Sequence, residues 1–81
     1  MALYFAPSAG RHHISQARIL YVLGNHIWSY SAGRGVTLYF GPDRSGIDLE
    51  VATVRRGEDI FVIHAMKIRR SLIAEYRRRL P

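Results

Sequence analysis

The chain has 81 residues, of which 48% are hydrophobic and 22% charged, with no cysteine and a formal net charge of +6. This size leaves room for one hydrophobic core, so we expect a single folded domain over residues 1–81. The lack of cysteine excludes disulfides and thiolate metal sites, and no apolar run approaches the roughly 20 residues that span a bilayer. The segment MALYFAPSAG lacks the basic flank and the long apolar core of a secretory signal. Since a small domain without disulfides also fits a cytosolic setting, we expect a cytoplasmic protein with no membrane partner.

The positive charge is concentrated near the C-terminus. Residues 67–81 hold six basic side chains and one acidic one, whereas residues 1–66 hold six basic and five acidic ones. Eleven of the twelve basic residues are arginine, whose planar guanidinium can bind two phosphate oxygens at once. This distribution favours a polyanionic partner, although a solvated basic helix or a surface for an acidic protein would carry the same charge.

The N-terminal residues predict one strand followed by short helical segments. Residues 2–6 are apolar and aromatic, and Pro7 ends them as a strand. Residues 7–13 are compatible with a single helical turn. Ser15 is a good N-cap for a second helix over residues 16–23.

The middle of the chain predicts three strands. Residues 26–35 are rich in turn-forming residues, so we expect a connection whose aromatic side chains cover the edge of the sheet. The following segments are alternately or continuously apolar, which predicts strands at 36–40, 47–54 and 59–66. Short loops join these strands, so they should form an antiparallel meander. The last of them is apolar on both faces and is expected at the centre of the sheet.

A final helix is predicted from Ile68 onward, because apolar residues recur at helical spacing as far as Leu80. The order of elements is then β-α(α)-β-β-β-α. This order predicts an α+β domain in two layers, with a four-stranded, mainly antiparallel sheet and the helices on one face.

The junction between the last strand and the final helix holds the candidate catalytic residues. His64 lies near the end of its strand and can act as an acid or a base near neutral pH, although it is equally compatible with a packed strand histidine. At about 100° per residue, Arg69 falls within the apolar arc of the helix. Its charge must therefore be paired or escape past the end of the sheet, and either outcome places it in a cleft near His64.

Other basic and aromatic side chains extend this candidate site. Tyr76 lies on the apolar arc, as a packed aromatic residue or as a proton donor. Arg70 and Arg77 form a stripe beside that arc, which fits phosphate contacts or a solvated face. Arg11, His12 and His13 would complete the cleft if the first helix packs over the same end of the sheet.

Two further pairs of titratable residues carry weaker signals. His12 and His13 are adjacent and cannot both point inward, and without a nearby carboxylate they are a weak metal signal, so no metal is expected. Asp48 and Glu50 lie on one face of their predicted strand, and we expect both to face solvent.

Three stretches resemble the small toxins of the RelE/BrnT type from bacterial toxin–antitoxin systems. HHIS at residues 12–15 is similar to the Lys/His-rich turn of those toxins, and GPDRSGIDLEVATVRRGEDIFVIHAM at residues 41–66 is similar to their meander. Their Arg-rich junction and later tyrosine match Lys67, Arg69, Arg70 and Tyr76. The chain departs from the pattern in its shorter first helix and in His64, where those toxins more often have serine.

The resemblance implies an endoribonuclease, ribosome-dependent or free, that a small antitoxin neutralises. Metal-free RNA cleavage uses the 2′-OH as nucleophile and needs a base, an acid and cations around the phosphate. We therefore expect a cofactor-free RNA-cleaving toxin that forms a hetero-oligomer with its cognate antitoxin. The expected catalytic residues are His64, Lys67, Arg69 and Tyr76, and the expected RNA contacts are Arg11, His12, Arg70 and Arg77.

The alternative is a non-catalytic module on the same fold that binds RNA or a protein. Trp28, Tyr30 and Tyr39 would then stack on bases while arginines contact phosphates.

Overall fold

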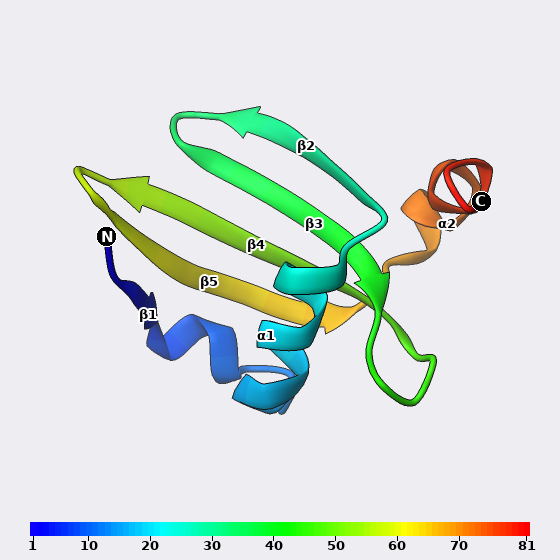
Figure 1. Cartoon of the computed structure of the whole chain (residues 1–81), viewed down its shortest axis with the longest axis horizontal. Helices are drawn as coiled ribbons and strands as arrows, with labels where there is room; N and C mark the ends of the chain where they lie inside the picture. Colours follow the sequence, from blue (N-terminus) through cyan, green and yellow to red (C-terminus); the bar gives the residue numbers. More distant parts are fainter.

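The computed structural model describes all 81 residues, as two α-helices, a 3-10 turn and a five-stranded sheet (Figure 1). The elements in chain order are β1 (Leu3–Phe5), η1 (Pro7–Gly10), α1 (Gln16–Asn25), β2 (Trp28–Gly33), β3 (Val36–Pro42), β4 (Asp48–Arg56), β5 (Asp59–Lys67) and α2 (Arg70–Arg78). The strand order is β1-β5-β4-β3-β2, with β1 parallel to β5 and all other pairs antiparallel. The α+β class and the meander are confirmed, but the sheet has five strands instead of four.

The additional strand is β2, which was expected to be a connection. Trp28 pairs with Phe40 and Tyr30 with Leu38, and the rings of Trp28 and Phe40 stack 4.6 Å apart. The glycines that resembled a loop form the turn of the β2–β3 hairpin, where residues 33–35 all have positive φ. Aromatic packing across the hairpin, which the sequence pattern does not reveal, therefore makes this segment the edge strand.

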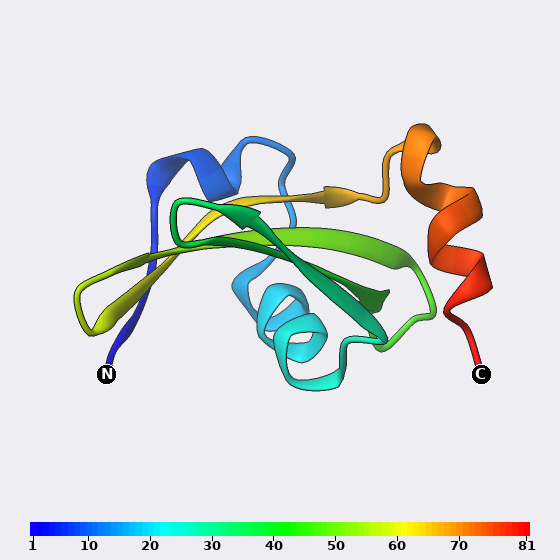
Figure 2. The ribbon, with the colours of Figure 1, turned by 90° about the horizontal axis from the view of Figure 1, so that it is seen from above.

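The two α-helices contact opposite faces of the sheet, so the expectation that both lie on one face is wrong. On one face, Ile19 and Val22 of α1 pack with Val51 of β4. On the other face, Tyr76 of α2 packs with Ala52, the next residue of β4. Figure 2 shows α1 beneath the sheet and α2 standing across its end. The inner strands are apolar on both faces, so each face needs a cover.

The short strand β1 ends at Phe5, and the 3-10 turn η1 then lies along the remaining edge of β5. A register shift near Ala52 leaves Ile63 as an extra residue in β5. The hydroxyl of Ser8 in η1 donates to the Ile63 carbonyl at 2.6 Å, which satisfies a polar group at this irregularity. The chain that leaves η1 then runs past the C-terminal end of β5, which brings His12 to His64.

The helix α2 begins two residues later than predicted. Arg69 is its N-cap with an extended backbone, and Arg70 is the first helical residue. The preceding N–H of Ile68 donates to the Asp48 carbonyl at 3.1 Å, so the chain stays attached to β4 beyond the end of β5. Neither α-helix is both long and apolar enough to cross a membrane.

Candidate functional site

Glu50 lies at the centre of a polar cluster at the end of the sheet, and its carboxylate is fully buried. The backbone N–H of Arg69 donates to Oε1 at 2.8 Å, and Nε of Arg69 lies 3.1 and 3.0 Å from the two carboxylate oxygens. Nη2 of Arg69 also donates to Oε2, and Nε2 of His64 lies 3.0 Å from the same oxygen. We call Glu50, His64 and Arg69 the Glu50 cluster.

The burial of Glu50 corrects the expectation that it faces solvent. Its neighbours Leu49 and Val51 point into the core between the sheet and α1. Strand alternation alone therefore assigns Glu50 to the other face, which was expected to be solvated. The opposite face is covered at this end of β4 by α2 and its N-terminal connection. The only local sign of this burial is an acidic residue inside a strand of apolar neighbours, and that sign alone does not identify the element that covers it.

The electrostatics of the cluster keep Glu50 ionised and orient His64. Burial raises the pKa of Glu50, but the hydrogen bonds from Arg69 and His64 outweigh it and hold the pKa below the ordinary value. A carboxylate only accepts hydrogen bonds, so Nε2 of His64 must carry the proton that it shares with Glu50. Nδ1 of His64 is therefore the nitrogen left for a substrate.

His64 is accessible and has a second imidazole beside it. Its side chain is 28% exposed. The ring of His12, which is exposed, lies 5.8 Å away between centroids at an interplanar angle of 82°. His12 was expected to contact RNA, and its position allows a more direct role, because two adjacent imidazoles can divide the work of acid and base.

Arg69 combines an internal ion pair with an exposed surface. The predicted proximity of Arg69 and His64 is confirmed, since both bind the same carboxylate, although Arg69 precedes the helix instead of lying on it. The hydrogen bonds to Glu50 raise the pKa of Arg69, and the nearby Tyr30 also contributes. The Arg69 side chain remains 47% exposed, so it can meet an anion. Tyr30, expected to cover the sheet edge or, in the alternative, to stack on bases, thus lies near enough to Arg69 to affect it.

Tyr76 lies outside this site. The residue is only 1% exposed, and its hydroxyl donates to Asp48 Oδ1 at 2.8 Å. Burial and the neighbouring Asp48 raise the pKa of Tyr76 well above its usual range. A buried phenol that holds its proton this tightly is a poor catalytic acid, so the structure supports the packed-aromatic alternative. Asp48, expected to face solvent, serves to anchor α2.

Replacing Tyr76 with phenylalanine should lower the free energy of unfolding by about 1–2 kcal/mol, because Asp48 loses a buried donor. It should leave the predicted RNA cleavage unchanged. Chemical denaturation and a cleavage assay measure the two effects, with Tyr4→Phe at an exposed tyrosine as the control. A large loss of cleavage in a folded Tyr76→Phe protein would return Tyr76 to the chemistry.

The remaining predicted residues take no part in the hydrogen bonds of the Glu50 cluster. Lys67 pairs with Leu49, whose side chain lies on the α1 side, so it is on the opposite face of β5 from His64. This position corrects the expectation that Lys67 acts beside His64. Three predicted RNA contacts are exposed and form no ion pair with another side chain: Arg11, Arg70 and Arg77.

The two cationic members of the Glu50 cluster, His64 and Arg69, reach solvent outside any cavity, above the buried Glu50. None of the three cavities of the molecule is lined by His64 or Arg69. An open surface suits a linear polymer better than an enclosed small molecule. No three His, Asp or Glu side chains are arranged to hold a metal ion.

The arrangement provides the parts for proton transfer at an anion: one imidazole oriented by a carboxylate, a second imidazole facing it, and a guanidinium beside them. No protein-family model, curated protein or solved structure was found to match this chain.

Proposed function

We propose that this protein is an endoribonuclease that cleaves RNA by attack of a 2′-OH on the adjacent phosphate. The observation that carries the proposal is His64, held by buried Glu50 and facing His12 at 5.8 Å beside the exposed guanidinium of Arg69. The net charge of +6 adds a general attraction for RNA.

The proposed reaction assigns one role to each side chain. Nδ1 of His64 accepts the proton of the 2′-OH, whose oxygen then attacks phosphorus. Arg69 stabilises the charge of the pentacoordinate phosphate, and His12 donates a proton to the departing 5′-oxygen. The products are a 2′,3′-cyclic phosphate and a 5′-OH. Glu50 is a positioning residue, because it holds His64 and Arg69 without contacting the substrate.

The proposal keeps the biological setting that the RelE/BrnT resemblance implies. We propose a RelE/BrnT-like toxin of the cytoplasm, acting on mRNA and neutralised in a hetero-oligomer by a cognate antitoxin. The exposed arginines Arg11, Arg70 and Arg77 would guide the RNA strand to the cluster by contacts with phosphates.

The test is to incubate the purified protein with a single-stranded RNA in a metal chelator and to identify the ends of the products. We expect cyclic phosphate and 5′-OH ends, and no cleavage where one 2′-deoxy nucleotide replaces the attacking one. The His64→Gln protein, purified in parallel, controls for a contaminating ribonuclease. Products with 3′-OH and 5′-phosphate ends would overturn the proposed attack by the 2′-OH.

The second candidate function is RNA binding without cleavage. It is favoured by the aromatic surface of β2, where Trp28 and Tyr30 lie beside each other and Arg79 lies 5.2 Å above the Trp28 ring. Such a surface can stack on bases and contact phosphates. Salt-dependent binding of an RNA that stays intact would identify this function.

A further inference from the structure

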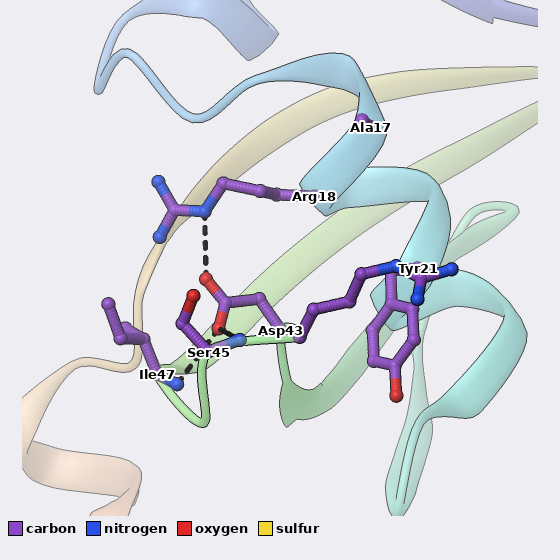
Figure 3. Close-up of a pocket in the computed structure, with 7 residues that line it drawn as sticks. Ala17, Arg18, Tyr21, Asp43, Ser45 and Ile47 are labelled. Atoms are coloured by element: carbon purple, nitrogen blue, oxygen red, sulfur yellow. Dashed lines mark hydrogen bonds and ion pairs between the residues drawn. The ribbon is translucent and has the colours of Figure 1, made fainter.

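One cavity of the molecule lies away from the Glu50 cluster, between the start of α1 and the β3–β4 loop (Figure 3). Its volume is about 390 Å³, which is within the range of small-molecule sites. Its polar lining comes from Arg18 and Tyr21 of α1 and from Asp43, Arg44 and Ser45 of the loop. The proposed chemistry at His64 uses none of these residues.

Asp43 holds this cavity in shape. It is buried, and its carboxylate accepts from Nε of Arg18 at 2.8 Å and from the backbone N–H groups of Ser45 and Ile47 at 2.8 and 2.9 Å. The hydrogen bond from Ile47 is the largest of the effects that lower the pKa of Asp43, with Arg18 adding to it against the effect of burial. The acidic group is therefore occupied and neutralised, and it presents no free oxygen to repel an anion.

The two arginines leave donors for a ligand. Arg18 bonds to Asp43 through Nε alone, so both of its terminal nitrogens lack a protein partner. The guanidinium of Arg44 lies 4.9 Å from the centre of the Tyr21 ring. Two guanidiniums and one paired carboxylate leave a lining charge of 2 − 1 = +1. Because this guanidinium lies over the Tyr21 ring, the stacked pair offers the outer plane of Arg44 to a nucleobase, with the phosphate on the second arginine.

The cavity lies at the same end of the sheet as the Glu50 cluster. The loop that forms it leads into Asp48, whose carbonyl accepts from Ile68, the residue before Arg69. Lys67 is exposed on the α1 side of this end. A single strand of RNA that crosses the end of the sheet would thus meet His64, then Lys67, and then the cavity.

We propose that this cavity binds one nucleotide of the RNA strand, at a position separate from the scissile phosphate, through Tyr21 and Arg44 for the base and Arg18 for the phosphate. This inference rests on the proposed RNA substrate. It also assigns Lys67 a place along the strand instead of a catalytic role.

The test compares Arg44→Glu with Arg56→Glu, the same charge change at an exposed arginine at the opposite end of β4. The probes are uncleavable 2′-O-methyl oligonucleotides of two and eight nucleotides, with affinity measured by fluorescence anisotropy. For Arg44→Glu we expect about tenfold weaker binding of the longer probe and unchanged binding of the shorter one. Arg56→Glu should affect the two probes alike and only slightly.

Equal losses in the two variants, or wild-type affinity in Arg44→Glu, would overturn the proposed nucleotide site. A titration of the wild type with a nucleoside monophosphate, followed by NMR, should shift the signals of Tyr21 and Arg44 more than inorganic phosphate does. Both probes bind without being cleaved, so the site can stand if the ribonuclease proposal fails. If the wild type cleaves RNA but Arg44→Glu binds the longer probe with wild-type affinity, the nucleotide site is wrong and the ribonuclease proposal stands.

Discussion

Replacing His64 with glutamine should lower the rate of RNA cleavage by about 10²–10⁴-fold, the usual contribution of a general base. The glutamine amide can still donate to the buried carboxylate of Glu50, as Nε2 of His64 does, but it cannot accept a proton from the 2′-OH. The folded state should therefore survive while the chemistry is lost. Single-turnover cleavage rates with protein in excess, together with a thermal melt, separate the two effects.

The matched control is His26→Gln, an exposed histidine whose Nδ1 lies 3.1 Å from the Leu23 carbonyl. We expect it to cleave RNA at the wild-type rate. His12→Gln should also lose activity if His12 donates the proton to the 5′-oxygen. An RNA with a good leaving group at that oxygen should restore cleavage in His12→Gln but not in His64→Gln, because only the acid becomes unnecessary. Wild-type rates in the His64→Gln protein would end the proposed mechanism.

Replacing Arg69 with alanine should destabilise the protein by about 3 kcal/mol, because Glu50 then keeps a buried charge without its main partner. We take the lower end of the range for buried pairs because the Arg69 side chain is 47% exposed and His64 remains. For a domain of this size the melting temperature should fall by roughly 15 °C. Chemical denaturation measures the free energy, and Arg70→Ala, at an exposed arginine without an ion pair, should change it by less than about 0.5 kcal/mol.

The pH dependence identifies the cause of this loss. In the wild type, the pKa of Glu50 lies below its ordinary value of 4.5. The stabilisation from the pair is thus fully present above about pH 4.5 and is lost as the pH falls through the lower pKa of the folded state. Without Arg69, burial should raise the pKa of Glu50. The Arg69→Ala protein should then lose stability as the pH rises through that raised value, because the buried carboxyl group becomes ionised. The difference between the two proteins should be largest near neutral pH and shrink on acidification.

A double variant completes the test. Arg69→Ala combined with Glu50→Gln removes the buried charge, so it should be more stable at neutral pH than Arg69→Ala alone. The amide can still accept from the backbone N–H of residue 69. A double variant as unstable as the single one would show that the loss comes from packing and not from an unpaired carboxylate.

Several elements follow from local patterns that the structure confirms. Ser15 was predicted as an N-cap, and its Oγ accepts from the N–H of Arg18 at 3.3 Å as α1 begins at Gln16. The three central strands follow from alternating or continuous apolar residues, within a few residues of their observed bounds. The meander follows from the short loops that join them. These features depend on contacts between residues that are near one another in the chain.

Other features depended on partners that are remote in the chain. The strand β2 needed the aromatic side chains of β3 opposite it. The pairing of His12 with His64 needed η1 to follow the edge of β5, where Ser8 bonds to the irregular residue Ile63. The type and spacing of residues along one segment do not show which remote segment will pack against it.

The sequence by itself therefore determined the α+β class, the basic C-terminal region and the presence of His64 and Arg69 at one junction, because periodicity and charge are properties of short segments. Only the tertiary structure decided that Glu50 is buried and bonded to both of these side chains, that Tyr76 is buried and bonded to Asp48 instead, and that Lys67 lies on the opposite face of β5. Burial depends on which element covers each face of the sheet, and here α2 covers the face that strand alternation assigned to solvent. The candidate site is thus a consequence of packing on both faces of β4.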